Sequence, residues 1–466
     1  MLYKNVKDLI ERTKTAIHIS RDGIRLEDKA KLRAKVIDEL VYNLCLNQNQ
    51  AIKEGCYWVI WELANELGIY PSSIQGLYEA KGKERYSKIT VPAVNIRGLT
   101  YDAARALIRT AMKSKSLSFI FELAKSEIGY TFQRPAEYVA VCLAAAIKEG
   151  FLGPLFIQGD HFQLKAKNFV QDPDKEIKAL KEIIKEAVQA GFYNIDIDSS
   201  TLVDLTKETV DKQQWNNYDV CAKLTAFIRG MEPEGLTVSV GGEIGEIGGK
   251  NTTPDEFYAF MRGFRSQLDK YGKNLQGISK ISIQTGATHG GVVLPNGTMA
   301  KVKLDFETLR TISRIARQDY GLGGAVQHGA STLPDEAFGH FPETETVEVH
   351  LATGFQNIIY ESKDFPKGLR EEIYTWLKVN CAADRKEGMS EEQFIYKTRK
   401  KGFGPFKKEL MDLPESVREN IAQQLEEKFT FLFQKLNATN TEALVNKYIK
   451  PARIKKPCPE VLAKSL

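Results

Sequence analysis

The sequence predicts an α/β fold: a (β/α)8 TIM barrel with helical extensions before and after it. Between Thr90 and about Tyr360, short apolar runs alternate with amphipathic segments of helical periodicity. Eight such runs occur here, and most lack a polar alternation, as expected for strands buried on both faces. Eight βα units in a region of this length are typical of a (β/α)8 barrel, with a doubly wound open sheet as the alternative.

The candidate strands all lie in this central region. They are ITVPAVNI (89–96), SLSFIFEL (116–123), GPLFIQGD (153–160), NIDIDSS (194–200), LTVSVGGEIG (236–245), ISKISIQTG (278–286), GGAVQHG (323–329) and VEVHLATG (347–354). After the first three strands we expect helices from Tyr101, from about Pro135 and from about Asp174.

Two further regions flank the barrel, so that the chain is divided into residues 1–85, 86–365 and 366–466. The first is expected to be helical, because its apolar residues recur at helical spacing and β-branched runs are sparse. The last is helix-rich and charged, and its tail KPARIKKPCPE (450–460) is expected to be irregular.

Composition excludes several classes of protein. The net charge of +5 is small for 466 residues, and basic and acidic side chains are interleaved, so nothing indicates nucleic-acid binding. We find no apolar stretch long enough to span a membrane and no secretion signal. The six cysteines are scattered without a C-x-x-C pair, which argues against a disulfide framework. These features favour a cytoplasmic protein.

Histidines concentrate at the predicted strand ends. The chain has six histidines, and four of them follow or end a candidate strand: His161, His289, His328 and His350. A barrel enzyme keeps its catalytic groups at the C-terminal ends of its strands. Imidazoles that converge from different strands would suit zinc with one coordination position left for substrate. Taken singly, each could equally be a hydrogen-bonded histidine at a strand end.

The region from about Thr90 to Asn357 resembles class II, zinc-dependent fructose-bisphosphate and tagatose-bisphosphate aldolases. Five segments follow the order and approximate spacing of that family. They are VPAVNIRGLTYDAARALI (91–108), GDH (159–161), GGEIGEIGG (241–249), THGG (288–291) and QHGAST (327–332). The C-terminal helices resemble the closing segment of the family more loosely.

The resemblance implies a set of metal and catalytic residues. His161, His289 and His328 would bind Zn²⁺, or another divalent metal, and Glu243 matches a carboxylate that lies near the metal. Asp160 would move the proton of the hydroxyl at the bond being cleaved, which is a task for a carboxylate beside the metal. Asn95 matches an asparagine within reach of the substrate.

The phosphate site departs from the family pattern. Gly290, Gly329, Ser331 and Thr353 keep the elements of a backbone amide cradle, which suits an anion. The Asn-Ile-Asp-Thr of the family reads His350-Leu351-Ala352-Thr353 here, which makes His350 a substrate-binding candidate. Lys125 and Lys250 are possible anion contacts, with surface lysines as the alternative.

The second proton transfer of the family belongs to a glutamate on a mobile loop. That loop reads KNTTPDE here, so only Glu246, Asp255 or Glu256 could take its place, and Glu246 is our candidate. Elsewhere, Asp196 and Asp198 are expected to point to opposite faces of their strand, so that one of them lines the barrel mouth.

The resemblance implies cleavage of a ketose bisphosphate to dihydroxyacetone phosphate and an aldehyde such as glyceraldehyde 3-phosphate. The substrate would be a phosphorylated sugar and the protein a homodimer or homotetramer. Two alternatives remain open at this stage. One is a metal-dependent epimerase or aldolase that acts on a sugar or sugar acid without two phosphates. The other is a non-catalytic aldolase-like subunit.

Overall fold

The computed structural model describes residues 1–245, 250–286 and 304–466. Its strands are β1 (Ile17–Ser20), β2 (Gly23–Leu26), β3 (Ile69–Ser72), β4 (Val91–Asn95), β5 (Ile120–Ala124), β6 (Gly153–Gln163), β7 (Asn194–Asp198), β8 (Ser239–Gly245), β9 (Lys280–Ile283), β10 (Ala325–Gln327) and β11 (Glu348–Leu351). Strands β4 to β11 match the eight candidate strands, so that prediction is confirmed.

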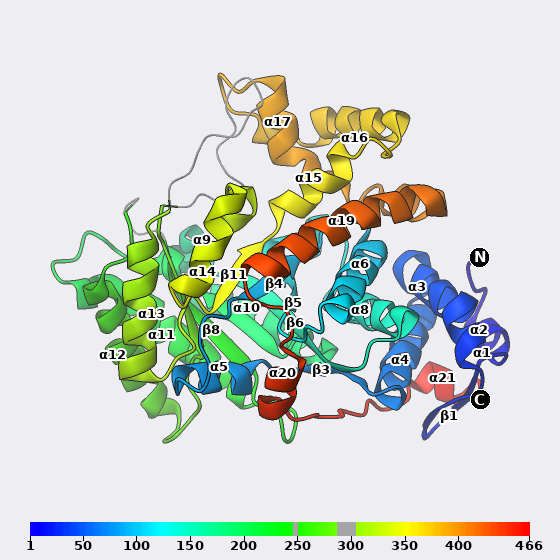
Figure 1. Ribbon diagram of the computed structural model, residues 1–466, viewed down its shortest axis with the longest axis horizontal. Coiled ribbons are helices and arrows are strands. Elements are labelled where there is room, and N and C mark those ends of the chain that lie inside the picture. The colour runs from blue at the N-terminus through cyan, green and yellow to red at the C-terminus, as the bar shows by residue number, and fades with distance from the viewer. Residues whose placement is uncertain (246–249, 287–303) are drawn as a thin grey trace.

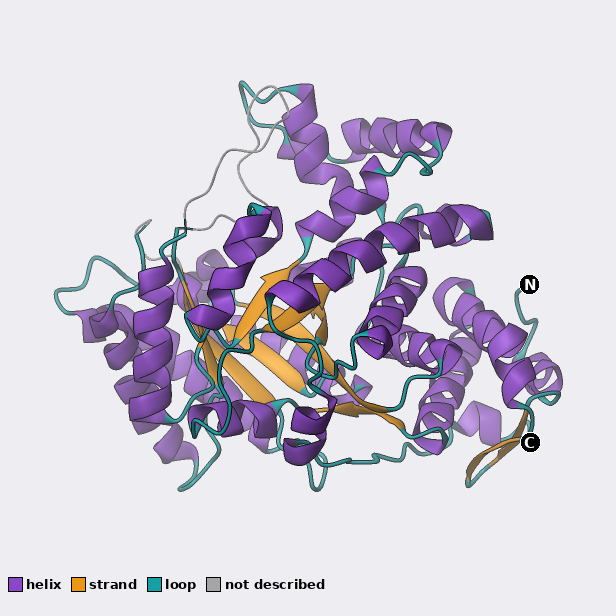
Figure 2. Cartoon of the chain, in the orientation of Figure 1, coloured by secondary structure: helices purple, strands orange, loops and turns teal. Residues whose placement is uncertain are grey.

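A closed parallel barrel forms the centre of the molecule (Figure 2). Each strand from β4 to β11 pairs in parallel with the next, and β11 pairs with β4, with Glu348 opposite Val91. This closure excludes the doubly wound open sheet, whose two edge strands stay unpaired.

The barrel helices follow their strands in the expected βα order (Figure 1). They are α6 (Thr100–Lys113), α7 (Lys125–Tyr130), α8 (Pro135–Glu149), α9 (Ala166–Gln171), α10 (Pro173–Ala190), α11 (Val210–Arg229), α12 (Pro254–Tyr271), α13 (Phe306–Tyr320), α14 (His340–Glu343) and α15 (Thr353–Glu361). The helix starts predicted near Tyr101, Pro135 and Asp174 are confirmed within one residue.

The side chains of each barrel strand form two sets, one on each face of the strand. On β11, Val349 and Leu351 alternate with Glu348 and His350, and all four are buried. Successive side chains of a strand point to opposite faces. The apolar set therefore packs against the surrounding helices, whereas the polar set points into the barrel. A TIM barrel interior is usually filled by branched apolar side chains, so charged residues there need a reason.

The N-terminal extension contains strands as well as helices, so the expectation of an all-helical segment was incomplete. Its helices are α1 (Val6–Thr13), α2 (Lys29–Lys31), α3 (Ile37–Leu46), α4 (Gln50–Glu66) and α5 (Gln75–Gly82). Strands β1 and β2 form an antiparallel hairpin, and β3 adds to the barrel sheet beside the first residues of β6. The hairpin has a period-two signal, because buried Ile17 and Ile19 alternate with His18 and Ser20.

The C-terminal extension is helical and returns to the N-terminus (Figure 1). Its helices are α16 (Lys367–Asn380), α17 (Glu391–Thr398), α18 (Lys407–Met411), α19 (Glu415–Lys435), α20 (Glu442–Tyr448) and α21 (Glu460–Ala463). Residues 449–459 are irregular, as predicted, and bind α4 through hydrogen bonds from Trp58 and Trp61 to backbone carbonyls of the tail. Among the described residues, no helix has the length and apolarity to cross a membrane.

Candidate metal centre and active site

A β-bulge in β6 directs two consecutive polar residues into the barrel mouth. Gly159 pairs with Ile195 and Phe162 with Ile197, so β6 has one residue more than β7 between these pairs. His161, in the bulge, has a φ of 42°, a left-handed conformation that costs energy in a residue other than glycine. In a regular strand neighbouring side chains diverge. The bulge instead lets both Asp160 and His161 line the same cavity.

His161, Glu243 and His328 form the first group that could hold a metal. They come from β6, β8 and the end of β10, and each offers a ligand atom within 4.8 Å of the other two. Glu243 Oε2 lies 3.3 Å from His161 Nδ1, and Glu243 Oε1 lies 3.8 Å from His328 Nδ1. Two imidazoles and a carboxylate are a ligand set that catalytic zinc sites use.

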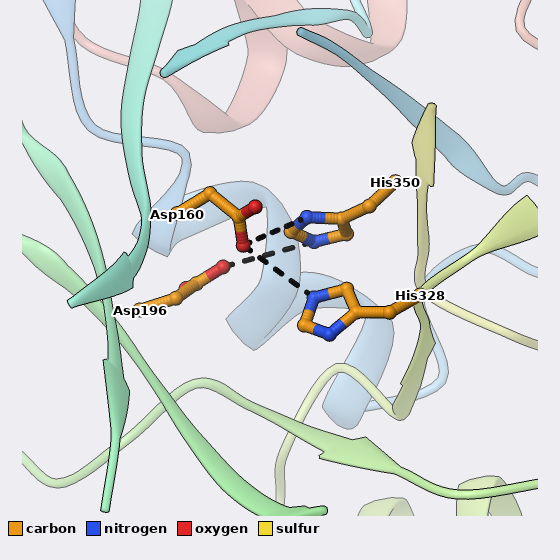
Figure 3. A group of neighbouring side chains, drawn as sticks. All are labelled: Asp160, Asp196, His328 and His350. Carbon is orange, nitrogen blue, oxygen red and sulfur yellow. Dashed lines mark ion pairs between the residues drawn. The ribbon is translucent and has the colours of Figure 1, made fainter. Parts of the chain in front are cut away.

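A second group lies deeper in the barrel, where His328 and His350 point toward Asp160 and Asp196 (Figure 3). His350 Nδ1 lies 3.2 Å from Asp160 Oδ1, and His328 Nε2 lies 3.6 Å from the same oxygen. Both nitrogens of His350 face carboxylates, with Glu122 at 2.8 Å and Glu348 at 2.6 Å. Asp160 beside Nδ1 and Glu348 beside Nε2 favour a doubly protonated ring, which cannot bind a metal.

Lys280 already supplies a cation to this deeper group. Its ammonium donates to Asp196 at 3.0 Å, to Glu348 at 2.5 Å and to Gln158 at 2.7 Å, and it is 1% exposed. Gln158 in turn donates to Glu348 Oε1 at 2.7 Å. With its acids compensated in this way, the deeper group needs no metal ion to balance its charge, which leaves His161, Glu243 and His328 as the stronger candidate ligands.

The protonation states in the protein without metal follow from these contacts. Burial, together with the neighbouring His350 and His161, lowers the pKa of His328 to about 3, so this imidazole is neutral and able to act as a ligand. Burial opposes the charged form of His161, but Asp160 and Glu243 raise its pKa well above the usual value. A metal ion would therefore displace a proton from His161.

Two residues of this group, His161 and His328, line a cavity of about 590 Å³ at the C-terminal ends of the strands. The lining of the same cavity includes three basic side chains: Arg97, Lys125 and Lys400. Arg97 is paired with Glu127 at 2.6 Å, whereas no ion pair joins Lys125 or Lys400 to an acid in the described part of the chain. Burial lowers the pKa of both lysines. An anionic group in the cavity would offset that cost.

The sequence of this protein matches one family model, described as "Fructose-bisphosphate aldolase class-II", over residues 78–437. The chain belongs to the class II fructose-bisphosphate aldolase family. The matched segment includes every barrel strand and most of the C-terminal extension. Comparison with curated protein sequences gives no match.

Several solved structures have a similar fold at low sequence identity. The "fructuronate-tagaturonate epimerase UxaE" from Cohnella laeviribosi is 12% identical, covers 91% of this chain and 90% of its own, and gives a TM-score of 0.55. A "probable tagatose 6 phosphate kinase" from Sinorhizobium meliloti is 16% identical over 81% of this chain and 97% of its own, with a TM-score of 0.52. A fructose-bisphosphate aldolase from Campylobacter jejuni is 18% identical over 80% and 97%, with a TM-score of 0.47. At these identities the likeness concerns the fold alone.

Most residues that the aldolase resemblance singled out come together at this one mouth. The cavity is lined by the candidates Asn95, Asp160, His161, His328, Gly329, Ser331, His350 and Thr353. Glu243 joins them through its contacts with His161 and His328. Glu246, His289 and Gly290 lie outside the described residues. Of the other loop acids, Asp255 is exposed, and Glu256 caps α12 through Thr253.

The expectation for Asp196 and Asp198 was wrong. Residues two apart on a strand point to the same face, and both carboxylates point into the barrel of this aldolase-family protein. Asp198 Oδ2 lies 3.2 Å from His161 Nδ1, one layer above the contact between Asp196 and Lys280.

Several polar residues of the site were missed from the sequence: Glu122, Lys280 and Glu348. Each lies inside or at the end of an apolar run that was correctly assigned as a strand. Their charge could have revealed them, because a charged residue in a strand that is buried on both faces needs a partner inside the protein. Lys400 was missed for another reason, since it reaches the cavity from the C-terminal extension, in the short turn Arg399–Gly402.

Proposed function

We propose that this protein is a zinc-dependent aldolase that reversibly cleaves a ketose bisphosphate into dihydroxyacetone phosphate and an aldehyde such as glyceraldehyde 3-phosphate. The observation that carries the proposal is the convergence of Asp160 with His161, Glu243 and His328 at the C-terminal mouth of the barrel. Active sites of TIM-barrel enzymes lie at this mouth. Membership of the class II aldolase family supports the reaction type.

The metal would be held by His161, Glu243 and His328, with His289 as a further proposed ligand. The described donors fit Zn²⁺, because they are nitrogen and carboxylate oxygen atoms that come from separate strands. When bound, the ion would supply Lewis-acid stabilisation of the negative charge that develops on the ketose oxygens during cleavage.

Asp160 is the proposed base for the cleavage step. Its Oδ1 lies 3.9 Å from His161 Nε2 and 3.6 Å from His328 Nε2, so the carboxylate adjoins the metal ligands without belonging to their group. Burial opposes ionisation, but His161 and His350 hold the pKa of Asp160 well below its usual value. An ionised carboxylate at this position can take the proton of the C4 hydroxyl as the C3–C4 bond breaks.

The phosphates would bind to other residues of the same cavity. The cavity lining contains Gly329, Ser331 and Thr353 together with the ammonium-bearing side chains of Lys125 and Lys400. Arg97 donates to Thr353 Oγ1 at 3.4 Å, which brings a third basic side chain next to these residues. Cationic donors and backbone amides are the groups that bind phosphate oxygens in proteins.

The test is a cleavage assay with metal analysis. Purified protein is assayed with fructose 1,6-bisphosphate and tagatose 1,6-bisphosphate, before and after removal of metal and with added Zn²⁺. We expect about one bound divalent ion per chain, formation of dihydroxyacetone phosphate, and loss of activity on chelation. A protein that binds no metal and cleaves neither substrate in the presence of Zn²⁺ would be the non-catalytic subunit, and the proposal would fail.

A second candidate function is epimerisation or cleavage of a sugar acid. The observation that favours it is the replacement of the Asn and Asp of the phosphate strand by His350 and Ala352, while basic side chains remain in the cavity lining. A single carboxylate or phosphate would suffice to engage Lys125 or Lys400. Assay with ketohexuronates separates the two candidates, because the epimerase would form a stereoisomer without releasing a three-carbon product.

A further inference from the structure

Cleavage of a ketose by this site leaves one proton transfer without a described residue. When the C3–C4 bond breaks, its electron pair stays on the C3 side as an enediolate, and C3 must then accept a proton. Of the three loop acids considered for this task, Glu246 lies outside the described residues and Asp255 is exposed. Glu256 is committed to the cap of α12, where its Oε2 accepts from the Thr253 backbone at 2.8 Å. Another carboxyl group is available in the wall of the cavity.

Glu122 is a carboxyl group of the cavity wall that the cleavage step does not use. It lies on β5, next to β6, and it lines the same cavity as Asp160. The two strands pair with Ala124 opposite Asp160, so Glu122 lies one inward layer below Asp160 on the neighbouring strand. Glu122 is 1% exposed, and among the described residues no hydrogen-bond partner reaches its Oε2 with good geometry.

Glu122 and Asp160 meet at one nitrogen. His350 Nδ1 lies 2.8 Å from Glu122 Oε2 and 3.2 Å from Asp160 Oδ1. Their surroundings are otherwise unequal. Within the described ranges, Asp160 faces three imidazoles within 4 Å, those of His161, His328 and His350, whereas Glu122 faces that of His350 alone. Two carboxyl groups in unequal environments take different protonation states and can divide the acid and base roles between them.

The environment of Glu122 favours its protonated form. Burial is the main cause and raises the pKa of Glu122 to about 8, with the charge of Asp160 adding to the effect and His350 opposing it. A carboxyl group with a pKa near the working pH is suited to donate a proton in one step and to recover it in the next.

We propose that Glu122 is the second acid–base residue of the reaction and donates the proton that C3 of the enediolate accepts. This inference rests on the proposed aldolase function. In the cleavage step, Asp160 takes the C4 hydroxyl proton, C4 becomes the aldehyde carbon and the bond pair passes to the enediolate. In the second step, that pair accepts the Glu122 proton at C3, and C2 becomes the ketone. Asp160 then releases its proton to solvent and the Glu122 carboxylate regains one, so the cycle closes.

The test compares the two proton transfers in Glu122→Gln. Proton exchange at the hydroxymethyl carbon of dihydroxyacetone phosphate is followed by incorporation of solvent deuterium. Cleavage alone is followed with hexacyanoferrate(III), which oxidises the enediolate and so removes the need to protonate it. We expect the exchange rate to fall about 100-fold to 10,000-fold, the range for loss of a general acid. Oxidant-coupled cleavage should stay within about ten-fold of the unmodified protein, the effect of one weak contact, with unchanged metal content.

Glu137→Gln is the matched control, because Glu137 is a buried glutamate that pairs with Lys407 at 2.6 Å outside this cavity. It should leave both rates unchanged. Equal losses of exchange and cleavage in Glu122→Gln, or no loss of exchange, would overturn the inference. If Glu122→Gln does not fold, Glu122→Asp decides in the same way, since its shortened carboxyl should slow exchange more than cleavage. Absence of both activities in the unmodified protein would instead count against the proposed function itself.

Discussion

The ammonium of Lys280 on β9 lies 2.5 Å from Glu348 Oε1 on β11, across the interior of the barrel. Neither side chain is more than 1% exposed. A buried ion pair rarely adds net stability, because both charges lose their hydration. Removal of one partner is a different matter, since the other charge then stays buried without compensation.

Replacement of Lys280 by methionine should therefore destabilise the fold strongly. Asp196 and Glu348 both depend on this ammonium, so we expect the free energy of unfolding to fall by about 3–5 kcal/mol. Chemical denaturation of Lys280→Met and of unmodified protein measures the difference. Lys428→Met is the control, because Lys428 pairs with the exposed Asp335 at the surface and should cost less than about 1 kcal/mol. Equal losses in the free energy of unfolding for the two variants would show that the buried ion pairs contribute no more to stability than a surface pair.

The barrel could be predicted from the sequence because its strands are short apolar runs separated by amphipathic segments. The interior was harder. An apolar run predicts a buried strand but does not tell which polar residue within it finds a partner, and Lys280 finds Glu348 from a strand 68 residues further along the chain. The β6 bulge was also beyond prediction, since a single extra residue relative to β7 leaves no mark in the sequence of β6 itself.

The site was predictable in so far as glycines and histidines mark the strand ends. His161 and His328 were identified in this way and lie with rings 4.2 Å apart. No comparable sequence pattern surrounds Lys400. It reaches the cavity only because of how the C-terminal extension packs against the barrel, which its neighbours in the chain do not indicate.

Replacement of His328 by alanine should abolish both metal binding and turnover. His328 faces Glu243 on one side and Asp160 on the other, so its loss opens the metal group and disturbs the base. We expect metal content after dialysis to fall below about one tenth of the unmodified value, since losing a single ligand removes most of the affinity. Metal analysis together with the cleavage assay checks this. His340→Ala, which alters an exposed histidine paired with Glu343, should retain both properties.

Asp160→Ala should lower the rate of cleavage but leave metal binding intact. The carboxylate lies beside the group of His161, Glu243 and His328 but is not part of it. We therefore expect full metal content with kcat lowered by about 100-fold to 10,000-fold, the range for loss of a general base. Steady-state kinetics on protein of measured metal content gives the answer. An unchanged kcat would remove Asp160 from the mechanism.

Lys400→Met should weaken substrate binding more than turnover. Its ammonium lines the cavity, and no ion pair joins it to an acid within the described ranges. A hydrogen bond to a charged group contributes about 1.5–3 kcal/mol, so KM for a phosphorylated substrate should rise about ten-fold or more. The metal content should stay the same. Lys401→Met, next in the chain, removes a lysine that pairs with Asp384 and should leave KM unchanged. A KM equal to that of the unmodified protein would place Lys400 outside the binding site.

Lys81 should make stability rise with pH in the alkaline range. This lysine is 1% exposed, and burial lowers its pKa to about 8, with Glu345 opposing the shift. In the unfolded chain its pKa is about 10.4. Between pH 8 and about 10.4 the unfolded state binds more protons than the folded state, so the free energy of unfolding increases with pH. The stability that Lys81 gains at high pH is lost as the pH falls through 8.

Urea denaturation of unmodified protein and of Lys81→Met, at several pH values across this window, measures the effect of Lys81 on stability. The stability difference between them should grow toward high pH, whereas Lys83→Met, at an exposed neighbouring lysine, should show a constant difference. Parallel curves for Lys81→Met would mean that Lys81 keeps an ordinary pKa in the folded protein.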